Sequence, residues 1–131
     1  MTPSDLPNVS VIVPIYNGEV DLPDLLACLA AQTYPCDRVE FLLVDNNSSD
    51  RTAEILQSAS QSEPRFRYLC ENQIQSSYAA RNLGVRQATG EILAFTDADC
   101  RPDPTWLVNL IQPFEEAGVG LVAGEIKALS G

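Results

Sequence analysis

The residues best suited to chemistry in this chain are aspartates that directly follow short apolar segments. Asp97 and Asp99 come after segment 92–96 and stand one residue apart, and Asp45 comes after segment 41–44. Carboxylates gathered in one partly buried place raise each other's pKa and cost stability unless a cation neutralises them. Oxygen ligands without histidine suit a hard ion, so the pattern indicates Mg²⁺ or Mn²⁺ at Asp97 and Asp99.

A plainer interpretation of a single aspartate after a strand is a turn former or a helix cap. It suits Asp50 and Asp103 taken singly, but capping explains only one member of an Asp-x-Asp pair. Asp45 lies between these cases. Residues 48–50 are better placed to cap the next helix, which would free the Asp45 carboxylate to accept a hydrogen bond from a base N–H.

Three further kinds of side chain have both a structural and a functional interpretation. Arg81 is either a solvated charge or a partner for a diphosphate or for one of the acids. We expect Tyr16 and Tyr78 to be half-buried packing residues, with stacking on a base as the alternative. We interpret Cys100 as an incidental small residue, because the chain has no histidine to activate its thiol.

The elements that must position these residues alternate along the chain. Segment 9–15 is β-branched, which is typical of a strand buried on both faces. The apolar spacing from Leu22 to Ala30 predicts a helix capped by Asp21, with Pro23 in its first turn, ending near Thr33. The same reasoning predicts strands at 41–44, 66–69, 92–96 and 119–122, and helices over about 50–60, from Ser76 or Ser77 to about Ala88, and around 106–111.

This order predicts an α/β fold, a mostly parallel sheet with helices on both faces. Ligands collect at the carboxyl ends of such strands. The residues there are Pro14, Tyr16 and Asn17 after the first strand, Asp45 after the second, and Asp97 and Asp99 after the fourth.

Composition narrows the classes of partner. The chain has 131 residues, 45% of them hydrophobic, which fits one domain over residues 1–131. Its net charge of −10 disfavours nucleic acid and anionic membranes, although a divalent cation could still join carboxylates to a phosphate ligand. The four cysteines show no CxxC pair and are expected to be free thiols. No apolar stretch could span a bilayer, so we expect a cytoplasmic protein, either free or peripheral at the cytoplasmic face of a membrane.

Five blocks of the sequence together resemble the family 2 glycosyltransferases, which have the GT-A fold. They occur in the order of the family and cover nearly the whole chain. The blocks are VSVIVPIYN at 9–17, QTYP at 32–35, FLLVDNNSSDRT at 41–52, ARNLG at 80–84 and GEILAFTDAD at 90–99.

The resemblance implies a role for particular residues. Pro14 to Asn17, including Tyr16, would line the nucleotide pocket, and Asp45 would hold the base. Asp97 and Asp99 would form the Asp-x-Asp element that binds Mn²⁺ or Mg²⁺, with Asp99 as the more direct ligand, and Arg81 would lie near the nucleotide or diphosphate. The family's usual Asp-Asp after the second strand is Asp45-Asn46 here, which removes one charge.

The implied reaction moves a sugar from a nucleotide-diphosphate-sugar donor to a hydroxyl of a glycan, lipid or protein acceptor, with inversion and with a metal ion. A general base must take the proton of the acceptor. In the family this base lies on a later segment, and Glu125 is a poor candidate, so we expect the base beyond Gly131. The chain would then be the N-terminal, nucleotide-sugar-binding portion of a catalytic domain that is incomplete at its C-terminus.

Two other classes of function compete with this one. A nucleotide-sugar-binding module or inactive fragment would bind the nucleotide with metal but transfer no sugar. A phosphoryl-transfer enzyme of the haloacid dehalogenase type also has Asp-x-Asp after a strand, but it expects the motif after the first strand and Thr or Val where Arg101 stands. A Rossmann dehydrogenase is disfavoured because no Gly-x-Gly-x-x-Gly follows the first strand.

Overall fold

The computed structural model describes residues 6–117, with side chains described as far as Gln112. Strands and helices alternate along this part of the chain, as the sequence predicts. The elements are β1 (Val9–Ile15), α1 (Leu22–Ala30), the 3₁₀ helix η2 (Cys36–Arg38), β2 (Val39–Asp45), α2 (Thr52–Ser62), β3 (Phe66–Cys70), α3 (Ser77–Gln87), β4 (Ile92–Phe95) and α4 (Trp106–Ala117).

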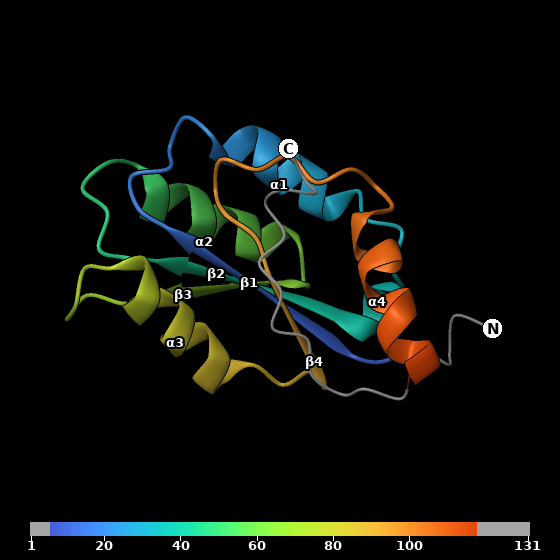
Figure 1. Ribbon diagram of the computed structural model, residues 1–131. Coiled ribbons are helices and arrows are strands. Elements are labelled where there is room, and N and C mark those ends of the chain that lie inside the picture. Colours follow the sequence, from blue (N-terminus) through green and yellow to red (C-terminus); the bar gives the residue numbers. More distant parts are fainter. Residues whose placement is uncertain (1–5, 118–131) are drawn as a thin grey trace.

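The described strands form one sheet in the order β3-β2-β1-β4, and every neighbouring pair is parallel. From β1 the chain moves outward through β2 to β3, then crosses back to place β4 on the other side of β1. α1 and α2 lie on one face of the sheet and α3 on the opposite face (Figure 1). The predicted α/β fold with helices on both faces is therefore confirmed.

The larger core lies between the sheet and helices α1 and α4. Alternate side chains of β1 point into it, because successive residues of a strand face opposite sides. Burying each such apolar side chain contributes roughly 1.5–3 kcal/mol. Its fully buried members include Val11, Val13, Leu25, Leu29, Leu107 and Ile111.

Helix α3 lies close against the other face of the sheet, and Gly84 makes this approach possible. A Cβ atom at Gly84 would lie 2.6 Å from Cγ2 of Ile12 in β1, so any larger residue would push the helix away. The helix begins as predicted at Ser76, whose Oγ accepts a hydrogen bond from the backbone N–H of Ala79 at 3.0 Å. Any site residue that α3 carries is therefore held directly over β1.

Two predictions about the first helix were wrong. α1 ends at Ala30 instead of near Thr33, because Gln32 and Thr33 hydrogen-bond to the segment before α4. Gln32 Nε2 donates to the carbonyl of Asp103 at 2.6 Å, and Thr33 N donates to that of Pro104 at 2.9 Å. Asp21 stands at the N-cap position, but its side chain caps nothing there and pairs with Arg101 instead. Most other boundaries agree with prediction to within about two residues.

The predicted strand at 119–122 and Glu125 lie outside the described residues, and the single domain over 1–131 stays a prediction. All four cysteines are free thiols, as expected. Within residues 6–117, none of the helices has the length and apolar character needed to cross a bilayer.

Candidate active site

The sheet brings the predicted acids to one edge, which we call the carboxyl edge because the strands end there. Asp45 is the last residue of β2, and Asp97 follows β4 by two residues. β1 lies between these two strands. Since neighbouring strands are about 4.8 Å apart, the ends of β2 and β4 are separated by roughly 10 Å, a distance that one nucleotide can span but one cation cannot.

Among the described residues, Asp97, Asp99 and Cys100 form a group that could hold a metal ion, and each offers one ligand atom within 4.8 Å of the others. Asp97 is half-buried, Asp99 is exposed and Cys100 is buried. Asp45 is not part of this group, and metal binding at Asp97 and Asp99 stays a prediction. Cys100 is therefore more than the incidental small residue that the sequence predicts, because its Sγ lies 3.9 Å from Asp99 Oδ1. The signal for this in the sequence is its position next to Asp99.

Arg81 joins the site through Asp97. It stands on α3, and its Nη2 lies 3.4 Å from Asp97 Oδ1. Both side chains are partly buried, with exposed fractions of 32% and 22%. Of the roles considered for Arg81, the structure therefore favours a partner that holds one of the acids.

Asp45 is more fully engaged than its sequence suggested. It is buried, its Oδ1 accepts a hydrogen bond from Ser48 N at 3.0 Å, and its Oδ2 accepts one from the Tyr68 hydroxyl at 3.2 Å. Burial, followed by the negative charge of Asp45, raises the pKa of Tyr68 well above its usual value. Both carboxylate oxygens of Asp45 thus help to shape the turn after β2, and its contact with a base stays a prediction.

A hollow of about 200 Å³ opens at the carboxyl edge. We call it the carboxyl-edge hollow. Three of the six residues predicted to bind the nucleotide line it, whereas Asn17, Asp45 and Arg81 do not. The lining residues are Pro14, Ile15, Tyr16, Asn46, Ser77 and Asp97.

Asn46 lines the hollow although it was not among the residues predicted to bind the nucleotide. Its side chain is buried, and Nδ2 donates to the carbonyls of Glu71 at 3.1 Å and Ile74 at 2.9 Å. These two bonds fasten the segment between β3 and α3 to the end of β2, and they fix which way the amide points. A signal was present, since Asn46 replaces the second acid of the family's Asp-Asp.

Asn17 connects two loops of the carboxyl edge. Its φ of 49° lies in the left-handed region, which asparagine tolerates better than most residues. Its Oδ1 accepts a hydrogen bond from Ser49 N at 2.8 Å, and its own N–H donates to Ser48 Oγ at 2.8 Å. The structure therefore gives Asn17 a supporting role, and direct contact with a nucleotide stays a prediction.

Asp50 and Asp103 behave as the plainer interpretation expected. Asp50 Oδ1 accepts from Thr52 N at 2.9 Å at the start of α2, and Asp103 Oδ1 accepts from Thr105 N at 3.0 Å just before α4. Both side chains thus satisfy backbone groups that a helix start would otherwise leave unpaired.

The tyrosines differ from their predicted packing role. Tyr16 is 53% exposed and Tyr78 is 73% exposed, so neither is half-buried in a core. Tyr16 lines the carboxyl-edge hollow, which leaves its ring available for contact with a ligand.

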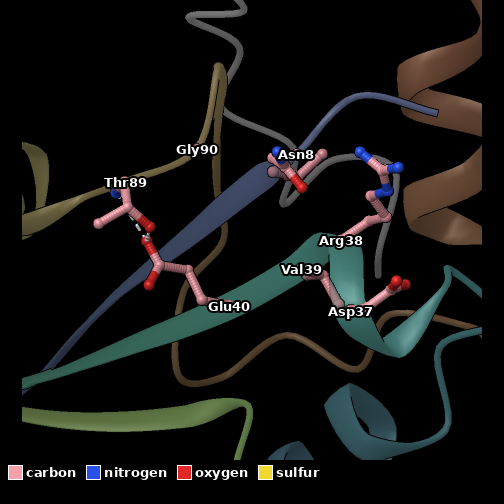
Figure 2. A pocket seen from close by; sticks show the side chains of 8 residues that line it. Asn8, Asp37, Arg38, Val39, Glu40, Thr89 and Gly90 are labelled. Atoms are coloured by element: carbon pink, nitrogen blue, oxygen red, sulfur yellow. Dashed lines mark hydrogen bonds between the residues drawn. The ribbon is translucent and has the colours of Figure 1, made fainter. Parts of the chain in front are cut away.

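A second hollow, of about 270 Å³, opens at the opposite edge of the sheet, where β1 and β2 begin (Figure 2). We call this the amino edge. Glu40 is one of the charged residues that line it, and it accepts hydrogen bonds from Ser10 Oγ at 2.6 Å, Thr89 N at 2.8 Å and Arg67 Nη1 at 2.9 Å. Burial alone would raise the pKa of Glu40, but the hydrogen bonds outweigh it and lower the pKa. This acid therefore has a structural role.

The sequence and the fold of the chain are similar to those of known proteins. Glycosyltransferase AglE of Haloferax volcanii is 43% identical over 124 residues, which are 95% of this chain and 41% of AglE. The structure of TarS 1-349 from S. aureus in complex with UDP matches with a TM-score of 0.75 and 29% identity, over 83% of this chain and 32% of that chain.

A structure of the mannosyltransferase PcManGT from Pyrobaculum calidifontis, in complex with GDP-Man and Mn²⁺, matches with a TM-score of 0.73 and 32% identity, over 83% of this chain and 32% of that one. The chain thus spans well under half the length of these relatives. The model of the family described as glycosyl transferase family 2 matches residues 10–130. With its fold and its relatives in agreement, the chain belongs to glycosyl transferase family 2 and has the GT-A fold.

Proposed function

We propose that this chain binds a nucleotide-diphosphate sugar with the help of a divalent cation and takes part in transferring the sugar to an acceptor hydroxyl with inversion. One observation carries the proposal: Asp97 belongs both to the group of possible metal ligands and to the wall of the carboxyl-edge hollow. A cation on this acid would therefore adjoin any ligand in the hollow. The bound UDP of TarS and the GDP-Man and Mn²⁺ of PcManGT support the same assignment.

The nucleoside would occupy the carboxyl-edge hollow. Tyr16 offers an exposed ring for stacking on the base. The amide hydrogens of Asn46 already point at two backbone carbonyls, which leaves its Oδ1 as a neutral acceptor for a base N–H. Asp45 would support the site indirectly, because its hydrogen bond with Ser48 N shapes the turn that carries Asn46.

Asp97 and Asp99 would hold the cation, which we propose to be Mn²⁺ or Mg²⁺. Carboxylate oxygens at this spacing fit a hard cation, and the Cys100 thiol adds a softer neighbour. When bound, such an ion offsets the charge of the diphosphate and stabilises the charge that builds up as the sugar leaves. A cation also explains how a chain of net charge −10 can accept an anionic ligand.

Transfer with inversion also needs a base for the acceptor proton, on the face of the sugar opposite the diphosphate. We place this base in the part of the relatives' length that this chain does not cover, since the chain spans 41% of AglE. We also infer a cytoplasmic location, which is supported by the four free cysteines.

The proposal is tested by titrating the chain with UDP, GDP, CDP and ADP in a calorimeter, with and without Mn²⁺. We expect at least one of these diphosphates to bind only when Mn²⁺ is present. Binding of all four without metal, or of none with metal, would contradict the proposed site. If the metal-dependent binding is found, a sugar-release assay with a protein that includes the rest of the catalytic domain separates a transferase from a binding module.

A further inference from the structure

Arg101 follows the Asp97/Asp99 pair in the sequence and reaches back to the turn that carries it. Its Nη1 donates hydrogen bonds to the carbonyl oxygens of Ala98 at 3.1 Å and Cys100 at 2.9 Å. These two residues flank Asp99 on either side. One guanidinium nitrogen therefore holds the peptide group directly before Asp99 and the peptide group that follows Cys100, so the turn is fixed on both sides of Asp99.

The other side of the same guanidinium is attached to helix α1. Nη2 donates to Asp21 Oδ1 at 2.8 Å, and Nε lies 3.9 Å from Asp24 Oδ2. α1 is itself fixed in the main core by Leu22 and Leu25, both fully buried. Arg101 thus connects the turn that carries the acids to a helix that is packed in the larger core.

We propose that Arg101 is a positioning residue for the metal site, which holds the backbone around Asp99 in the arrangement that binds the cation. The inference rests on the proposed function, because it needs a cation at Asp97 and Asp99. A planar fork suits this task, since it bonds two carbonyls and a carboxylate in fixed directions, and a lysine ammonium does not provide that geometry.

Charge and positioning predict opposite effects of removing Arg101, which makes the inference testable. A positive charge beside a cation site repels the cation. If Arg101 acted only through its charge, Arg101→Met would strengthen Mn²⁺ binding. If it positions the turn, Arg101→Met weakens binding, because Asp99 then samples arrangements that the ion does not accept.

The experiment measures Mn²⁺ affinity from the free Mn²⁺ signal in electron paramagnetic resonance, for the full chain and its variants without nucleotide. Arg101→Met and Arg101→Lys are each expected to weaken binding about tenfold or more, the usual effect of losing a group that orients a metal ligand. Arg51→Met makes the same charge change as Arg101→Met. Arg51 is an exposed residue whose side chain pairs with Glu54, so its replacement is expected to change the affinity by less than roughly twofold.

Variants of Asp21 separate positioning from general loss of structure. Asp21→Asn keeps an oxygen acceptor for Arg101 and should bind Mn²⁺ nearly as well as the original chain, whereas Asp21→Ala should weaken binding in the same direction as Arg101→Met. Thermal unfolding without metal identifies any variant that fails to fold, and Arg101→Lys and Asp21→Ala then provide independent tests.

Two failures can be told apart. If the original chain binds no Mn²⁺, the proposed function fails and the inference fails with it. If the original chain binds Mn²⁺ and the folded Arg101 variants bind it equally well or more tightly, the proposed function stands and the positioning role of Arg101 is wrong.

Discussion

The two edges of the sheet both carry acids, but Glu40 at the amino edge and Asp99 at the carboxyl edge have opposite surroundings. At the amino edge, Glu40 accepts hydrogen bonds from Ser10, Arg67 and both the N–H and the hydroxyl of Thr89. At the carboxyl edge, Asp99 is exposed, and the described residues give it only a weak contact with the Cys100 thiol. A carboxylate without donors next to a second carboxylate gains from a cation, whereas one surrounded by donors has no need of it.

The difference also shows that size does not identify a site. The amino-edge hollow is larger than the carboxyl-edge hollow, at about 270 against 200 Å³. Its acid is nevertheless satisfied by the protein itself. The carboxyl edge differs in the groups that lie close together there: the acids Asp97 and Asp99, the oriented amide of Asn46 and the exposed ring of Tyr16.

The largest effect is expected from Asp99→Asn, which removes the charge least engaged by the protein. We expect the Mn²⁺ affinity to fall at least about tenfold, or 1.4 kcal/mol, because an amide oxygen binds a hard cation more weakly than a carboxylate does. Calorimetric titration measures it. Asp103→Asn is the matched control, since Asp103 lies outside the group of possible metal ligands; an equal loss in both variants would break the comparison.

Glu40→Gln should have the reverse profile, with lower stability and unchanged metal binding. The amide can no longer accept from all four donors, and a donor left unsatisfied costs about 1–3 kcal/mol of the free energy of unfolding. Urea unfolding measures the loss, and Mn²⁺ titration provides the second readout. A Glu40→Gln chain that lost Mn²⁺ binding while fully folded would show that the two edges are coupled.

Acid should remove the difference between Glu40→Gln and the original chain. The folded pKa of Glu40 is lowered from its usual 4.5, so its contribution to stability is present above about pH 4.5 and is lost as the pH falls through the lower folded value. The gap between the two unfolding midpoints should therefore be widest near pH 7 and should close as the pH falls below the usual pKa of 4.5 and through the lower folded pKa. A gap that stayed constant over this range would mean that the charge of Glu40 contributes nothing.

The smallest effect is expected from Tyr68→Phe, which divides the carboxyl edge into supporting and ligand-binding acids. The change removes the hydroxyl that donates to Asp45 Oδ2 and should cost about 1 kcal/mol of unfolding free energy. Mn²⁺ affinity should stay the same, because Asp45 lies outside the metal group. A clear drop in that affinity would show that Asp45 acts on the cation after all.

The sequence predicts the fold well because its signals are local. The β-branched segment of β1 and the serine that caps α3 each identify an element without knowledge of the rest of the chain. The place of Asp97 and Asp99 at the carboxyl edge could also be predicted, because it follows from the order of strands and helices along the chain.

Other features depend on contacts between distant parts of the chain and could not be predicted. Asp21 is a residue type that commonly caps helices, but its carboxylate pairs with Arg101, which is 80 residues away in the sequence. α1 ends early because Gln32 and Thr33 find partners 71 residues further on. Asp45 appeared free only because the hydroxyl of Tyr68 could not be placed beside it.

These long-range bonds give α1 a function beyond packing. Arg101 pairs with Asp21 at the N-terminal end of α1. Residues 103 and 104 accept hydrogen bonds from Gln32 and Thr33, just past the C-terminal end of the helix. A helix of nine residues is about 14 Å long. The segment from the acids to the start of α4 is thus hydrogen-bonded to both ends of a rigid helix. We therefore expect ligand binding and release to move side chains in this segment while its main chain stays in place.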